Sequence, residues 1–116
     1  MIQKLNFGEI WFANLNPQVG TEPRKMRPVL IIQDQFLLDV SHPSTLIIPL
    51  TTKLIDNVYP LRIRIKAFEL LERDSDLLID QIRAIDNKRL VNGPLAICEN
   101  EFMKTVREAI IEVIGR

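Results

Sequence analysis

The first 51 residues contain three short apolar runs, each ended by proline, glycine or polar residues. The runs are Glu9–Leu15, Arg27–Gln33 and Ser44–Thr51. Each is seven or eight residues long and rich in residues that favour β-structure, so each is too short for an ordinary helix. The runs are apolar almost throughout, which predicts strands covered on both faces. Residues 34–43 between two of them are expected to form a loop or an irregular element.

The second half of the chain continues this pattern and then changes period. Leu61–Lys66 alternates apolar and basic residues, which is typical of a strand with one apolar face. Leu77–Ile85 is predicted to be a further strand, and Asn92-Gly93-Pro94 a break after it. The tail has apolar residues at helical spacing, with Asn100 as the expected N-cap and Gly115 just past the end. We therefore expect a mainly β (α+β) fold, a small β-barrel or strongly bent sheet with a C-terminal helix.

Length and composition limit what such a fold can be. With 116 residues the chain has room for one domain, residues 1–116. Lys and Arg total 15 and Asp and Glu total 15, which argues against a surface that is basic all over but allows a local basic groove. Cys98 is the single cysteine, and we expect it to be a buried apolar side chain. The N-terminus lacks a signal peptide and no apolar run approaches the ~20 residues of a membrane span, so a cytoplasmic protein without a membrane partner is predicted.

Several kinds of site are disfavoured by the residues present. One His and one Cys cannot supply an N/S zinc site. Asp74, Asp76 and Asp80 lack the oxygen-ligand pattern of a calcium loop, and the four glycines form no phosphate-binding loop. His42 is interpreted as a surface histidine rather than a general base. We therefore expect neither a metal nor a cofactor.

What remains is arginine, threonine and carboxylate. Arg27 stands at the entrance of a predicted strand, and its guanidinium can contact two phosphate oxygens at once. Thr51-Thr52 offers hydroxyl donors, and Glu22 and Asp80 are possible proton acceptors. Such a set could stabilise a phosphorane while a ribose 2′-OH attacks its own phosphodiester. The residues alone leave two alternatives open: Arg27 could simply pair with Glu22, and the basic residues of 61–66 could be a solvated face.

Three blocks of sequence, in order, resemble a known family. They are GEIWFANLNPQVGTEPRKMRPVLIIQ, HPSTLIIPLTTK and DLLIDQIRAIDNKRL, which together extend from Gly8 to Leu90. This combination is similar to the MazF/PemK family of toxin endoribonucleases. The resemblance implies an SH3-like β-barrel with a C-terminal helix that works as a homodimer, the toxin half of a type II toxin–antitoxin pair. It further implies metal-independent cleavage of single-stranded mRNA to a 2′,3′-cyclic phosphate and a 5′-hydroxyl, and inhibition by a cognate antitoxin.

The resemblance also implies roles for individual residues. The catalytic set it implies is Arg27, Thr51, Glu22 and Asp80. The RNA-binding set we predict is Arg24, Lys25, Thr52, Lys53, Gln81, Arg62 and Arg64. Thr52 is the alternative to Thr51, since the alignment could slip by one. One branch of the family has an arginine where this chain has Leu78, which leaves open the acid–base role of Asp80.

Two other functions are compatible with the same barrel. A toxin similar to CcdB would bind a protein target, gyrase, and a noncatalytic barrel would bind RNA without cutting it. The combination of arginine and threonine favours the nuclease over both. Growth arrest with intact mRNA would favour the protein target.

Overall fold

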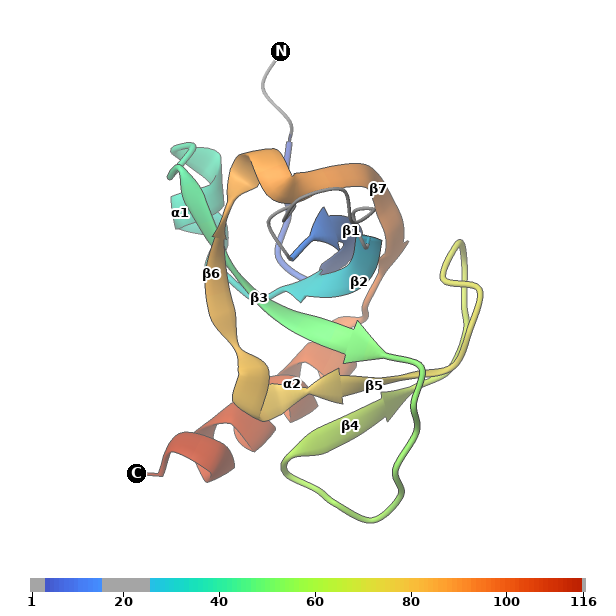
Figure 1. Cartoon of the computed structure of the whole chain (residues 1–116). Coiled ribbons are helices and arrows are strands. Elements are labelled where there is room, and N and C mark those ends of the chain that lie inside the picture. The colour runs from blue at the N-terminus through green and yellow to red at the C-terminus, as the bar shows by residue number, and fades with distance from the viewer. Residues whose placement is uncertain (1–3, 16–25, 116) are drawn as a thin grey trace, which may run out of the picture.

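A computed structural model of the chain describes residues 4–15 and 26–115. Within these residues the fold has seven strands and a long C-terminal helix (Figure 1). The strands are β1 (Glu9–Asn14), β2 (Met26–Ile31), β3 (Ser44–Thr51), β4 (Arg62–Ile65), β5 (Ser75–Leu78), β6 (Arg83–Asp86) and β7 (Leu90–Ile97). The helices are α1 (Gln35–Asp39), α2 (Asn100–Ile114) and the short 3-10 helices η1 (Ile79–Gln81) and η2 (Asn87–Arg89).

The strands form one antiparallel sheet in the order β4-β5-β3-β2-β1-β7, with β6 also paired to β3. In Figure 1 the β6–β7 segment curves around β1 and β2, and α2 lies below them in the view, in contact with η1. Within the described ranges the ladder does not close on itself, so the shape is barrel-like rather than a closed barrel. The predicted mainly β fold with a C-terminal helix is confirmed.

Both faces of the central strands are buried, as their continuous apolar runs predicted. Leu30 and Ile48 belong to the cluster that α2 completes with Met103 and Val106. Their neighbours along the strands point the other way, into a second cluster, which contains Trp11, Ala13, Val29, Ile31, Ile47, Ile85 and Leu90. Each fully buried Leu or Ile contributes roughly 2 kcal/mol. The two clusters therefore fix the strand register, because a slip by one residue would exchange the faces.

The segment predicted as one strand at Leu77–Ile85 is two strands with an interruption. Between Leu50 and Ile47, β3 advances three residues, whereas its partners advance six, from Leu77 to Arg83. The three extra residues are those of η1. The prediction was wrong here because an apolar run does not reveal where a strand bulges out of its ladder.

The predicted break at Asn92-Gly93-Pro94 also lies inside a strand, β7. Asn92 has a φ of 51°, and the register of β7 against β1 shifts across this segment. Turn-forming residues therefore mark a bulge here instead of a strand end.

The predicted terminal helix is confirmed as α2, with one correction at its start. The N-cap position is Glu99, not Asn100, and its side chain makes no capping hydrogen bond. At the other end Gly115 has a φ of 80° and its N–H donates to the Ile111 carbonyl at 2.9 Å. The region predicted to be irregular, 34–43, contains the single-turn helix α1, which the Asp34 carboxylate caps through the Phe36 N–H at 3.0 Å.

Candidate active site

Arg27 and Thr51 lie on neighbouring strands at matching positions. In the β2–β3 ladder Val29 pairs with Pro49, and two residues further in the same register stand Arg27 and Thr51. Residues two apart in a strand share a face, so the two side chains point to the same side of the sheet. Arg27 is exposed, and within the described ranges no carboxylate lies at ion-pairing distance from it. The fold therefore directs a permanent positive charge and a hydroxyl to one side of the sheet, two residues beyond the last β2–β3 pair.

Thr51 is the last residue of β3 and is half-buried. Its Oγ1 accepts a hydrogen bond from the Lys53 N–H at 3.2 Å, which ties the start of the next loop to the strand end. A hydroxyl that accepts one hydrogen bond still has its own proton to donate. Thr52 and Lys53 follow immediately and are both exposed.

Asp80 and Gln81 lie in η1, away from the Thr51 end of β3. Thr51 pairs with Asp76, and Asp80 is four residues further along, which displaces it by on the order of 10 Å. Both side chains are exposed because η1 stands outside the ladder. Glu22, Arg24 and Lys25 lie outside the described residues, so their predicted roles stay predictions.

A buried carboxylate that sequence reasoning missed lies beside Thr51. Asp76 is 1% exposed, and its oxygens accept from Arg64 Nε at 2.6 Å and Arg62 Nη1 at 3.2 Å. Its Oδ2 also accepts from the Ile55 N–H at 2.9 Å. The sequence holds no clear signal of this burial, because Asp76 follows Asp74 and Ser75 and its place opposite Arg64 arises only from the pairing of β4 with β5. In the sequence Asp76 was considered only as one of three aspartates that lack the pattern of a calcium loop.

These contacts set the charge state of the cluster. Burial alone raises the pKa of Asp76, but the hydrogen bonds from Arg64, the Ile55 N–H and Arg62 outweigh burial and leave the pKa below its ordinary value of 3.8. The same bonds, from Asp76 first and Asp56 second, raise the pKa of Arg64. The Asp76 carboxylate and the Arg64 guanidinium are therefore both charged at neutral pH.

A pH dependence of stability follows from Asp76. The pKa of Asp76 is lower in the folded chain than in the unfolded chain. The carboxylate therefore stabilises the fold at any pH above its unfolded-state pKa, and this stability is lost as the pH falls through its folded-state pKa. We expect the free energy of unfolding of the wild type to fall between about pH 5 and 2, and to fall less in Asp76→Asn. Urea denaturation across a pH series measures this. Equal pH slopes for the two proteins would contradict it.

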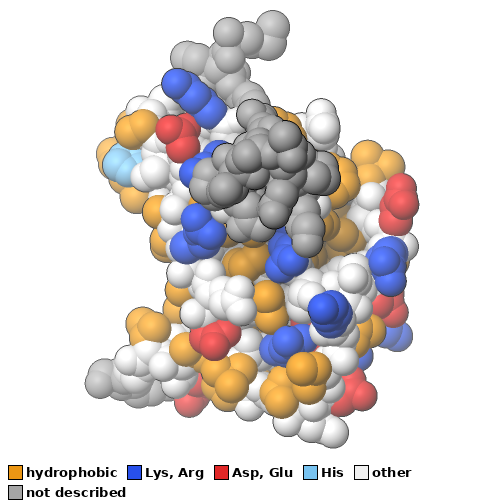
Figure 2. Space-filling model, in the orientation of Figure 1, with side chains coloured by type: hydrophobic (Ala, Val, Ile, Leu, Met, Phe, Trp, Pro, Cys, Tyr) orange, Lys and Arg blue, Asp and Glu red, His pale blue; other side chains and the backbone are white. Residues whose placement is uncertain are grey.

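Arg62 and Arg64 belong to the same cluster, so they are not simply a solvated basic face. Their side chains lie on the basic face predicted from the alternation in 61–66, yet both donate to Asp76, and Arg64 also donates to Asp56 at 2.7 Å. Part of their charge is therefore balanced within the protein. Figure 2 shows Lys and Arg side chains gathered on this face, over the ends of the central strands and the β4–β5 hairpin.

Cys98 and His42 are placed as the sequence predicted, one buried and the other on the surface. His42 is exposed. Cys98 is buried, and desolvation, followed by the charge of Glu69, raises the pKa of its thiol to about 12.

We expect the Cys98 thiol of the native protein to resist alkylation by iodoacetamide at pH 8 and that of the urea-unfolded protein to react, as mass spectrometry would show. Rapid labelling of the folded chain would contradict this burial.

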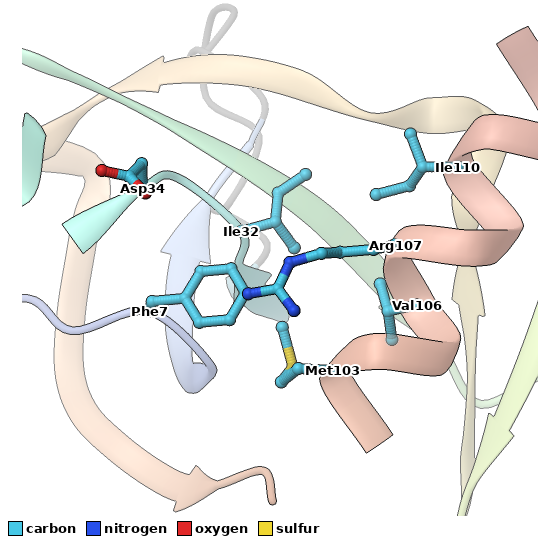
Figure 3. Close-up of a pocket in the computed structure, with 7 residues that line it drawn as sticks. All are labelled: Phe7, Ile32, Asp34, Met103, Val106, Arg107 and Ile110. Carbon is cyan, nitrogen blue, oxygen red and sulfur yellow. The ribbon is translucent and has the colours of Figure 1, made fainter. Parts of the chain in front are cut away.

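The hollows that the described residues line include the following two. One, of about 380 Å³, lies between the 55–59 segment and Arg62, Arg64 and Asp76. The other, of about 230 Å³, lies against α2 (Figure 3), where the Arg107 guanidinium lies 4.6 Å from the centre of the Phe7 ring. None of the predicted site residues lines the second hollow, so the first is the one connected to the candidate site.

The described part of the chain lacks two kinds of feature. No three His, Cys, Asp or Glu side chains gather there in a way that could hold a metal ion. No helix in those ranges has the length and apolar character needed to cross a membrane.

Comparison with known proteins identifies the family. Residues 6–114 match the family described as "PemK-like, MazF-like toxin of type II toxin-antitoxin system". The chain belongs to this family. It is also 36% identical over 104 residues to Endoribonuclease EndoA of Bacillus subtilis (strain 168), covering 89% of this chain and 88% of that protein. The predicted membership in a family of toxin endoribonucleases is thereby confirmed.

Solved MazF structures share the fold. MazF from Deinococcus radiodurans (Form-I) superposes with a TM-score of 0.76 at 21% identity, covering 99% of this chain and 100% of that one. The MazE-MazF complex (Form-II) of the same organism gives 0.79 at 20% identity, covering 98% of each chain. Mycobacterium tuberculosis MazF-mt6 gives 0.73 at 20% identity, covering 91% and 95%. The MazF fold thus extends over essentially the whole of this toxin.

Proposed function

We propose that this toxin cleaves single-stranded mRNA at specific sequences without a metal ion, leaving a 2′,3′-cyclic phosphate and a 5′-hydroxyl. The observation that carries the proposal is the placement of Arg27 and Thr51 at matching positions on β2 and β3, pointing to one side of the sheet. The endoribonuclease relative and the toxin family support the class of reaction.

The proposed step is a displacement at phosphorus within the RNA itself. The ribose 2′-oxygen loses its proton and bonds to phosphorus, and the bond from phosphorus to the 5′-oxygen breaks as that oxygen takes up a proton. Arg27 balances the charge that gathers on the phosphoryl oxygens, and the Thr51 hydroxyl donates to one of them. RNA supplies the nucleophile, so DNA should not be cut.

The proton acceptor is one of two carboxylates, Glu22 or Asp80. Asp80 stands in η1, exposed and displaced along β3 from Thr51. In a homodimer, which we also propose, a carboxylate could act on the partner's site as well as its own. Comparing Glu22→Gln with Asp80→Asn by the pH profile of cleavage distinguishes the two acceptors: the true acceptor's variant loses the acidic limb of the profile.

We further propose a cognate antitoxin in the cytoplasm as the partner that controls this activity. Solved relatives include MazE-MazF complexes and a mycobacterial endoribonuclease in complex with its cognate antitoxin. An acidic extended segment would complement the exposed Arg27 and Lys53 and block RNA there.

The test of the proposed function is cleavage in excess EDTA. Purified toxin is incubated with a panel of U-rich and A-rich RNAs and with a long natural RNA, and the cut ends are mapped by sequencing. We expect cuts at a short recurring sequence with 5′-hydroxyl ends, and none in DNA of the same sequence. Uncut RNA, or cutting that requires Mg²⁺, would refute the mechanism. Growth arrest with intact mRNA would instead favour a protein target.

A further inference from the structure

The loop at 52–61, which joins β3 to β4, is hydrogen-bonded to one buried side chain, that of Asp76. Asp76 Oδ2 accepts from the Ile55 N–H at 2.9 Å. Arg62 Nη1, which contacts Asp76, also donates to the Lys53 carbonyl at 2.8 Å. Arg64, which contacts Asp76 through Nε, donates through Nη2 to Asp56 at 2.7 Å. The carboxylate is therefore connected to the loop at three nearby points: directly at Ile55, through Arg62 at Lys53, and through Arg64 at Asp56.

Asp76 is also the ladder partner of Thr51. One residue thus connects the strand end that carries the candidate catalytic hydroxyl with the loop that follows it. A carboxylate that is 1% exposed must have its lone pairs satisfied, so its donors have little freedom to leave. The loop geometry next to Thr51 consequently depends on the charge of Asp76.

The loop presents a surface suited to unpaired bases. Leu54, Ile55 and Tyr59 are 43%, 51% and 57% exposed, so apolar and aromatic side chains gather on this loop as they do at many binding surfaces. Ile55 and Tyr59 line the hollow of about 380 Å³ together with Arg62 and Arg64. Aromatic and apolar side chains beside guanidinium groups are what unstacked bases and their phosphates bind.

We propose that Asp76 is a positioning residue for RNA recognition: by holding Arg62, Arg64 and the Ile55 N–H, it fixes the 52–61 loop in the shape that binds nucleotides beside the scissile phosphate. Asp76 does not touch RNA in this arrangement. It sets which sequences fit, through the loop. This inference rests on the proposed ribonuclease function.

The test is Asp76→Asn, which keeps the side-chain volume but removes the charge and turns an NH₂ group toward the arginine donors. We expect kcat/KM to fall on the order of ten- to a hundredfold, because a displacement of about 1 Å near the reacting groups has an effect of that size. We also expect a changed distribution of cut sites and faster amide exchange at residues 53–56, with the far-UV circular dichroism of the wild type.

The matched control is Asp74→Asn. Asp74 lies two residues away on the same segment, is exposed, and accepts from the Ala67 N–H at 2.8 Å instead of from the loop. It should retain the cut-site distribution of the wild type. A general loss of stability would reduce the cleavage rate of any variant, but it would not change which sequences are cut.

A second variant keeps the proposal testable if Asp76→Asn does not fold. Arg62→Gln removes the contact with the Lys53 carbonyl while Arg64 still pairs with Asp76, and it should also change the cut-site distribution. A folded Asp76→Asn, or in its absence Arg62→Gln, with wild-type cut sites and kcat/KM within about twofold of wild type would overturn the proposal. If the wild type cuts no RNA, the proposed function itself fails, and amide exchange at 53–56 unchanged by the substitution would separately refute the link between Asp76 and the loop.

Discussion

Arg27→Ala is expected to reduce RNA cleavage by about 10²–10³-fold while leaving the protein folded. The guanidinium is exposed at the start of β2 and contributes nothing to either apolar cluster, so its removal should not disturb packing. Its loss removes the charge that offsets the developing phosphorane. Single-turnover cleavage of a mapped RNA measures the effect, and thermal denaturation verifies the fold. Arg27→Lys should recover only part of the rate, because an ammonium cannot contact two phosphate oxygens in one plane.

The matched control for this experiment is Arg83→Ala. Arg83 is also an exposed arginine on a strand, β6, but it pairs with Ile47 at the other half of β3. It should cleave at close to the wild-type rate. If Arg27→Ala cleaved as fast as Arg83→Ala, Arg27 would not belong to the catalytic set.

Gly93→Ala is expected to destabilise the fold by about 3 kcal/mol, the upper end for overpacking a core. A Cβ at this position would lie 2.6 Å from Cγ and Cε3 of the Trp11 ring. The ring cannot easily move away, since Trp11 is buried and its Nε1 donates to Glu9 Oε1 at 3.0 Å. Urea denaturation followed by the fluorescence of this single tryptophan measures the loss in the free energy of unfolding. In thermal denaturation the same loss should lower the Tm by about 10 °C.

A double-mutant cycle isolates the Trp11 contact. In a Trp11→Leu background, followed by circular dichroism, adding Gly93→Ala should cost less than about 1 kcal/mol, because the smaller side chain leaves room for the new methyl group. An equal cost in both backgrounds would assign the effect to the backbone at Gly93 and not to the contact with Trp11.

Much of the fold could be predicted because the relevant signals are local. The apolar runs predicted β1, β2 and β3, and the helical spacing after residue 100 predicted α2. The interruptions at η1 and at Gly93 were missed because a bulge depends on the partner strand: the same residues would form a continuous strand against a partner of another length. Local propensity carries no information about that partner.

The site was predictable in part for a similar reason. Arg27 and Thr51 were identified from their residue types and from the family resemblance, and each stands at an end of a predicted strand. Asp76 was overlooked because a carboxylate in a row of acidic residues reads as solvent-exposed. Its burial follows from the pairing of β4 with β5, which places two arginines against it. Only the assembled sheet brings those three residues together.

The three-residue insertion at η1 has a consequence for how members of this family can diverge. Asp80 and Gln81 lie in a short segment that is anchored to β3 on both sides, through β5 before it and through β6 after it. Their side chains can be exchanged without moving either anchoring strand, because Ile79 alone of the three residues of η1 is buried. The fold thus keeps one small region where chemistry or sequence preference can vary from toxin to toxin while the packing beneath stays the same.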